Sequence, residues 1–212
     1  MSNEAIKEIF SEATDLINNR EYDKAAKHIE KVLNSSKDEN LACLLAKVYF
    51  YLENSSKAVK LLEKVLKNDP NNHLAMYLLA RVKYHLMDKK TEAIELVLKA
   101  LKLANDNSFY YSLGALIYFK LNNSNRALKL ANDALFLNEN NYEALCVLAA
   151  NYQNENDEEN SDKTYIKALN MAPSFDNKEF YFNSIFLDLA KTKKGYQLIK
   201  DAYLLNADFD YY

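Results

Sequence analysis

Apolar side chains recur along the chain at steps of four and three residues, the spacing that brings side chains to one face of an α-helix. In residues 55–70, SSKAVKLLEKVLKNDP, they are Ala58, Leu62 and Val65. Pro70 follows shortly after, and it cannot continue a helix because it lacks an N–H and its ring clashes with the preceding turn. The pattern predicts a helix that ends before Pro70, in which the small Ala58 lets a second helix approach closely.

This pattern returns at a fixed interval along the chain. The small residue that opens it is, in chain order, Ala25, Ala58, Ala93, Ala127, Ser161 and Gly195. Successive positions are 33, 35, 34, 34 and 34 residues apart. A period near 34 residues is the signature of stacked helical hairpins, since one hairpin cannot bury its apolar faces alone.

A second phrase marks the first helix of each hairpin. It has a large residue followed by a small one, as in LLAKVYFYL at 44–52, and a tyrosine follows three or four residues later. These tyrosines are Tyr49, Tyr84, Tyr118 and Tyr152, each nine residues before the small residue of the second helix. At this helical spacing they are expected to pack between helices.

The two phrases, with Glu21-Tyr22-Asp23 before Ala25, resemble the tetratricopeptide repeat. The chain departs from that family in having no tryptophan, no glycine in the turn between the paired helices, and only Pro70 and Pro173 as closing prolines. The resemblance implies an all-α fold, a right-handed superhelical solenoid of antiparallel helix pairs whose first helices line the concave side. It implies one solenoid over 6–209 and a tail at 210–212, with repeats at about 6–38, 39–72, 73–107, 108–141, 142–175 and 176–209. Repeat 3 carries an extra residue, which leaves two registers, one residue apart, for the first helices of repeats 3 and 4.

The amino-acid composition supports a helical fold and argues against one class of partner, nucleic acid. Two glycines and two prolines in 212 residues are far fewer than the roughly ten to fifteen of each in ordinary usage, which favours helices joined by short Asn, Asp and Ser turns. A net charge of -3, with no helix that forms a basic stripe, argues against nucleic acid as a partner.

There is no signal peptide and no apolar run of membrane-spanning length, so we expect a cytoplasmic protein without membrane insertion. Cys43 and Cys146 lie far apart in apolar segments and are expected to be buried thiols.

No residue pattern indicates catalysis. His28, His73 and His85 have no acidic partner at metal-ligand spacing, and two isolated glycines cannot form a phosphate-binding loop. The acidic stretch QNENDEENSD at 153–162 is typical of a solvated turn between paired helices, whereas acid–base catalysis needs a carboxylate in a shielded cleft. We therefore expect a protein that is not an enzyme and that binds no cofactor and no metal.

The resemblance also implies where a partner would bind, namely on the first helix of each pair, at positions that do not pack on the second helix. The expected partner-binding residues are Lys47, Tyr51, Tyr77, Arg81, His85, Phe119, Lys120 and Asn154. Tyrosine rings supply contact area at little entropic cost, and a neighbouring cation can hold a carboxylate. The alternative is that these rings pack inside the fold and that the cations are ordinary solvated charges.

These features favour a non-enzymatic scaffold that binds a peptide segment or a protein partner on its concave face. The alternative is a structural module that self-assembles through its terminal faces, because the last repeat ends in LLNADFDYY, with Phe209, Tyr211 and Tyr212. This C-terminal aromatic face is a candidate interface for a homo-oligomer, unless the chain continues beyond it or the tail folds back as a cap.

Two more specific functions of the family are less well supported. A chaperone-tail adaptor is disfavoured, because Phe10 and Thr14 occupy the positions at which that subset of the family carries Lys and Asn. A peptide-sensing transcriptional regulator would need a DNA-binding headpiece before the repeats.

Overall fold

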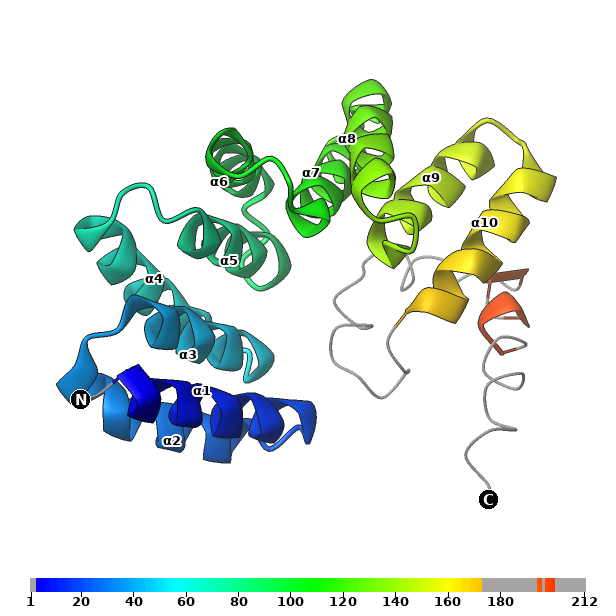
Figure 1. Cartoon of the computed structure of the whole chain (residues 1–212). Helices are drawn as coiled ribbons and strands as arrows, with labels where there is room; N and C mark the ends of the chain where they lie inside the picture. The colour runs from blue at the N-terminus through cyan, green and yellow to red at the C-terminus, as the bar shows by residue number, and fades with distance from the viewer. Residues whose placement is uncertain (1–2, 173–193, 196, 201–212) are drawn as a thin grey trace, which may run out of the picture. The chain divides into compact units, whose positions relative to one another are not determined.

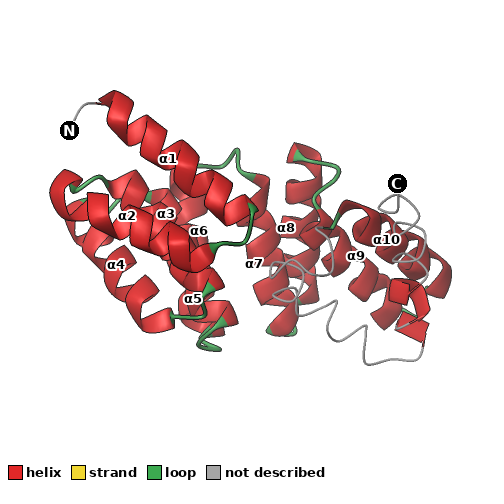
Figure 2. Cartoon of the chain, turned by 90° about the horizontal axis from the view of Figure 1, so that it is seen from below, coloured by secondary structure: helices red, strands yellow, loops and turns green. Residues whose placement is uncertain are grey.

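The computed structural model describes residues 3–172, 194–195 and 197–200, and residues 3–172 fold into helices joined by turns (Figure 1 and Figure 2). In chain order the helices are α1 (Asn3–Asn18), α2 (Tyr22–Ser36), α3 (Glu39–Tyr51), α4 (Ser55–Asn68), α5 (His73–His85), α6 (Lys90–Leu103), α7 (Ser108–Lys120), α8 (Ser124–Leu137), α9 (Tyr142–Asn154) and α10 (Glu158–Met171). The described residues contain no strand, so the prediction of an all-α fold is confirmed.

Contacts divide the chain into two compact units, Met1–Ala104 with α1 to α6 and Asn105–Tyr212 with α7 to α10. Consecutive helices pair as hairpins within each unit: α1 with α2, α3 with α4, α5 with α6, α7 with α8 and α9 with α10. The first helices of neighbouring pairs also touch, α3 with α5 and α7 with α9, so the predicted stacking of helix pairs is confirmed. A single solenoid over 6–209 stays a prediction, and its sixth repeat at 176–209 lies largely outside the described residues.

The repeated small residues lie where the paired helices meet. Ala25, Ala58, Ala93 and Ala127 have no exposed surface. Ser161 takes the same place in α10, where its hydroxyl donates a hydrogen bond to the carbonyl of Ala149 in α9 at 3.1 Å. That bond satisfies the only polar group that distinguishes serine from alanine at this position. The small side chains therefore allow the close approach that their spacing predicted.

The turns between paired helices close without glycine. One residue in each of these turns has a φ between 52° and 62°: Arg20, Glu53, Asp88, Asn122 and Asn156. These positions are 33, 35, 34 and 34 residues apart, the same intervals as the small residues. The N–H after the turn residue bonds back to the first helix, as when Asn54 donates to the carbonyl of Tyr49 at 2.8 Å and Asn123 to that of Tyr118 at 2.9 Å. This is a Schellman closure, formed here at a cost of about 1–2 kcal/mol for each left-handed residue that has a Cβ.

Asparagine and aspartate side chains begin most of the helices. Asp38, Asn54, Asn72, Asn107, Asn123, Asn141 and Asp157 each accept a hydrogen bond from a backbone N–H in the first turn of the next helix. Each bond satisfies a donor that has no partner inside the helix. The prediction of short Asn and Asp turns is thus confirmed, and in the acidic stretch 153–162 the turn itself occupies only 155–157.

Candidate functional site

The expected binding residues of α3 and α5 lie together in the first unit. With neighbouring aromatic residues they form what we call the α3–α5 cluster: Tyr22, Lys47, Phe50, Tyr51, Tyr77, Arg81, Tyr84 and His85. Steps of three and four residues along each helix bring these side chains to one face, and α3 and α5 touch. The cluster therefore combines aromatic rings with two permanent cations on neighbouring helices.

The first half of the cluster is centred on Tyr51 at the end of α3. The ring of Tyr22, from the start of α2, stacks on it with centroids 5.0 Å apart and planes 29° apart. Phe50 meets Tyr51 edge-on at 5.8 Å, and the Lys47 ammonium lies 5.7 Å from the Tyr51 centroid. Both arrangements are attractive, because aromatic rings have a negative face and a positive edge.

The second half of the cluster is centred on Arg81 of α5. Its guanidinium carbon lies 4.6 Å from the Phe50 centroid and 5.9 Å from the Tyr77 centroid. Only 8% of Arg81 is exposed, which corrects the alternative that this residue is an ordinary solvated charge. A guanidinium is planar and weakly hydrated, so it packs flat against rings more readily than an ammonium does.

His85 closes the cluster beside Arg81. Its ring meets Tyr84 edge-on at 4.6 Å and Phe50 at 5.8 Å. Burial, and then the charge of Arg81, lower the pKa of His85 to about 3. The imidazole is therefore neutral at physiological pH, and the charge of the cluster comes from its lysine and its arginine.

The other three expected binding residues belong to the second unit. Phe119 and Lys120 are half-buried in the last turn of α7, and Asn154 is the exposed last residue of α9. None of the contacts that define the α3–α5 cluster involves them. In this unit the hydroxyl of Ser112 donates to Glu143 at 2.7 Å, which ties α7 to α9.

The repeated tyrosines pack between helices, as their spacing predicted. Tyr49, Tyr84 and Tyr118 are buried, and Tyr152 is half-buried. The hydroxyl of Tyr118 accepts a hydrogen bond from Arg126 at 3.2 Å. That of Tyr49 donates to Glu30 of α2, and burial together with this carboxylate raises the pKa of Tyr49. These rings join helices, and two of them also border surfaces: Tyr84 contacts His85 in the α3–α5 cluster, and Tyr49 lines a groove beside α3.

A groove that the sequence reasoning overlooked lies between α2 and α4, with α3 behind it. It has a volume of about 810 Å³, and Lys57, Lys60 and Lys64 of α4 line one side. Their spacing of three and four residues puts them on one face of the helix, so the expectation that no helix forms a basic stripe was wrong for α4. The spacing of these lysines is visible in the sequence, but the sequence does not predict which other helices lie beside them to form the groove.

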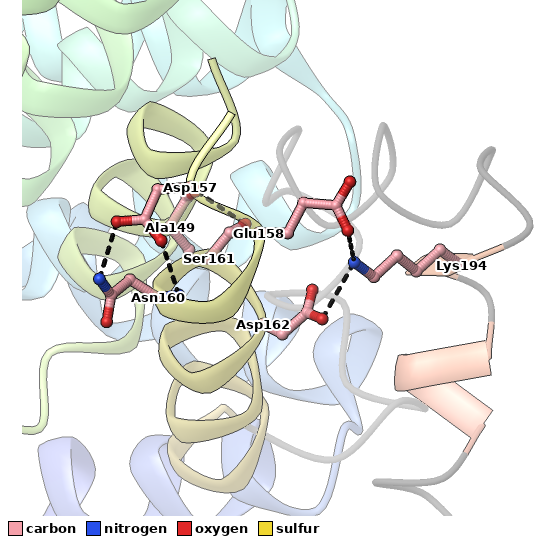
Figure 3. A network of polar contacts seen from close by, with 7 residues as sticks. All are labelled: Ala149, Asp157, Glu158, Asn160, Ser161, Asp162 and Lys194. Carbon is pink, nitrogen blue, oxygen red and sulfur yellow. Dashed lines mark hydrogen bonds and ion pairs between the residues drawn. The ribbon is translucent and has the colours of Figure 1, made fainter. Parts of the chain in front are cut away.

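Carboxylates of the acidic stretch in the second unit hold structure together (Figure 3). The Lys194 ammonium lies 2.9 Å from Glu158 and 3.0 Å from Asp162, and both contacts raise its pKa. The Asp157 side chain accepts from the backbone and the side-chain amide of Asn160, which lowers its pKa. Asp157 therefore caps α10, and Glu158 and Asp162 form ion pairs with Lys194.

The described residues offer little for metal or thiol chemistry. Within them no three histidine, cysteine or carboxylate side chains come together as metal ligands. Cys43 and Cys146 are buried, and burial, with smaller contributions from Glu39 and Asp38, raises the pKa of Cys43 to about 12. A thiol with so high a pKa is not a nucleophile at neutral pH. As for membranes, the part of the chain that the structure describes contains no helix with the length and apolarity needed to span one.

Two sequence profiles match parts of the chain. The profile of anaphase-promoting complex, cyclosome, subunit 3 matches residues 18–100, and a tetratricopeptide repeat profile matches residues 142–175. No curated protein matches the chain.

Several solved structures share the fold. PilF of Pseudomonas aeruginosa superposes with a TM-score of 0.70 at 16% identity, over 98% of this chain and 93% of that protein. A thermophilic TPR protein of Thermus thermophilus superposes with a TM-score of 0.68 at 18% identity, over 85% of this chain and 98% of that one. MamA superposes with a TM-score of 0.60 at 19% identity, over 75% of this chain and 93% of its own.

The profile matches, the repeated turn and packing positions, and the shared fold agree with one another. The chain belongs to the tetratricopeptide repeat family, whose members generally serve as non-catalytic scaffolds for protein interactions.

Proposed function

We propose that this scaffold binds a peptide segment of a partner protein on its concave face, and that the α3–α5 cluster is the centre of that site. The observation that supports this most is the arrangement of Lys47 and Arg81 against rings of α3 and α5. In the family these first helices line the concave side. A bound segment would reach the half-buried members of the cluster, Tyr22, Lys47, Tyr77 and His85, which lie over the buried Phe50, Tyr51, Tyr84 and Arg81.

Physical chemistry gives the cluster the properties of a binding hot spot. The rings hold one another by stacking and edge contacts, as Tyr22, Phe50 and Tyr51 do, so little side-chain freedom is lost when a partner arrives. Aromatic and arginine side chains at such positions dominate the binding energy of many interfaces. We therefore expect the partner segment to place an apolar or aromatic side chain on the rings and a carboxylate near Lys47.

Three further expectations are part of the proposal. Phe119, Lys120 and Asn154 are the residues with which the second unit would contact a partner. The protein acts without catalysis and without a cofactor, as family members generally do. The cytoplasmic location expected from the sequence stays a prediction.

Self-assembly through the terminal faces remains the alternative function. The residues that motivated it, Phe209, Tyr211 and Tyr212, lie outside the described residues. We therefore keep it as a sequence-based prediction beside the proposed one.

The proposal is tested by capturing partners from a lysate of the cells that produce the protein. The wild-type chain is compared with Lys47→Ala/Tyr77→Ala in the cluster and with a matched control, Lys99→Ala/Lys102→Ala, on the exposed side of α6. Circular dichroism establishes that all three are folded, and mass spectrometry quantifies what each retains.

We expect at least one protein to be retained by the wild type and the control and to be reduced about tenfold or more with the cluster variant, a loss of about 1.4 kcal/mol. If the cluster variant retains the same proteins in the same amounts, the α3–α5 cluster is not the binding site.

A further inference from the structure

The α2–α4 groove is a second surface, and it lies on the other side of α3 from the α3–α5 cluster. Leu45 and Tyr49 of α3 line the groove, whereas Lys47 and Tyr51, each two residues further on, belong to the cluster. Two residues along an α-helix correspond to a rotation of about 200°. The two surfaces therefore share α3 as a common wall and can be occupied independently.

The floor of the groove is apolar and its α4 side is cationic. Leu33 of α2 and Leu61 of α4 are half-buried and line it together with the buried Leu45. Lys57, Lys60 and Lys64 stand along α4 over a length of about 10 Å. An apolar strip bordered by a row of ammonium groups fits an amphipathic segment that has an acidic edge.

The negative charges of the groove are already engaged inside the protein. Glu30 accepts from the Tyr49 hydroxyl and lies 3.6 Å from the Lys57 ammonium. Asp38 accepts the N–H of Leu41 at 2.9 Å as the cap of α3.

The third carboxylate of the groove, Glu39, accepts from the Asn72 amide at 3.5 Å. Lys60 and Lys64, by contrast, are exposed, and the structure shows no ion pair between either of them and another described residue. The charge that the groove offers to an incoming ligand is therefore positive.

We propose that the α2–α4 groove binds an acidic amphipathic helix of a partner protein. Carboxylates at positions i, i+3 and i+7 of that helix would match the spacing of the three lysines, and the apolar residues between them would cover Leu33 and Leu61. This surface is additional to the proposed concave site and does not depend on it. The apolar floor and the engaged carboxylates of α2 and of the start of α3 favour such a helix over a nucleic acid, whose binding surfaces carry positive charge throughout.

The experiment measures binding of a fluorescent synthetic peptide to the full chain by anisotropy. The peptide carries glutamates and leucines on adjacent faces of a helix, and a second peptide has glutamine in place of every glutamate. The groove variant is Lys60→Glu/Lys64→Glu. The control, Lys99→Glu/Lys102→Glu on α6, changes the net charge by the same amount at exposed positions of the same unit. The cluster variant Lys47→Ala/Tyr77→Ala separates this site from the concave one.

We expect the glutamate peptide to bind the wild type, the control and the cluster variant with equal affinity and the groove variant at least tenfold more weakly. The glutamine peptide should bind the wild type more weakly than the glutamate peptide does. The inference is wrong if the glutamate peptide does not bind the wild type, if groove and control variants bind it equally, or if the two peptides bind alike. It is also wrong if a DNA duplex binds more tightly than the peptide and loses affinity in the groove variant.

Discussion

Individual side chains differ in how far their burial follows from the sequence. Arg81 was expected at a binding position from its place in the repeat, but it is almost fully buried against Phe50 and Tyr77. Its burial could not be predicted from the sequence, because it depends on a ring supplied by a different helix. The burial of Ala58 and Leu62 could be predicted, since it follows from spacing alone.

Leu62 provides a direct test of the core at this scale. Its side chain is completely buried in α4, so Leu62→Ala removes buried apolar atoms and leaves a cavity. We expect the free energy of unfolding to fall by about 2–5 kcal/mol, measured by urea denaturation. The exposed Lys67→Ala in the same helix should change it by less than about 0.5 kcal/mol. Equal effects of the two substitutions would contradict the packing described for α4.

His85 makes the stability depend on pH. Burial, and then Arg81, hold its pKa at about 3 in the folded chain, below the ordinary histidine value of 6.5, so the unfolded chain takes up the proton first as pH falls. The contribution of the neutral imidazole is complete above pH 6.5 and is lost progressively as pH falls from 6.5 towards 3. Unfolding midpoints should therefore decline over this range, and His85→Phe should flatten the decline. A variant with the wild-type slope would show that the fold does not hold His85 as a neutral ring.

At the scale of helices and turns, the sequence predicted more than at any other. Helical spacing and the 34-residue period located the pairs, and asparagine and aspartate marked their starts. The absence of a turn glycine is visible in the sequence, but its consequence is not: in each pair that the structure describes, a residue with a Cβ takes a positive φ at the same place. Propensity rules could not predict this, because helices packed on both sides of the turn impose the backbone conformation.

The turn residues give a prediction with an internal control. Asp88 has a φ of 52°, which a Cβ disfavours and glycine accepts. Both Asp88→Gly and Asp88→Ala remove the ion pair with Lys90, but only the alanine variant keeps the Cβ. We expect the glycine variant to be the more stable by about 1 kcal/mol in urea denaturation. An alanine variant of equal or greater stability would show that the turn is not strained.

At the scale of the whole molecule, the repeats determine which surfaces exist, and tertiary contacts determine what those surfaces offer. The period predicted stacked pairs, and the family resemblance implied that the first helices line a binding face, which stays a prediction. The lysines of the α2–α4 groove were visible in the sequence, but the residues of α2 and α3 that line the groove with them come from helices that only folding brings together. The C-terminal aromatic face lies outside the described residues, so its role as an interface stays a prediction.

The measurement that bears most directly on the proposed binding site is site-specific photo-crosslinking in the cells that produce the protein. A photoreactive residue replaces Tyr77 in the α3–α5 cluster in one strain and the exposed Lys99 of α6 in another. We predict covalent adducts with one partner protein from position 77 and none above background from position 99. Adducts from position 99 alone, or none from position 77 in a folded chain, would contradict the concave-face site.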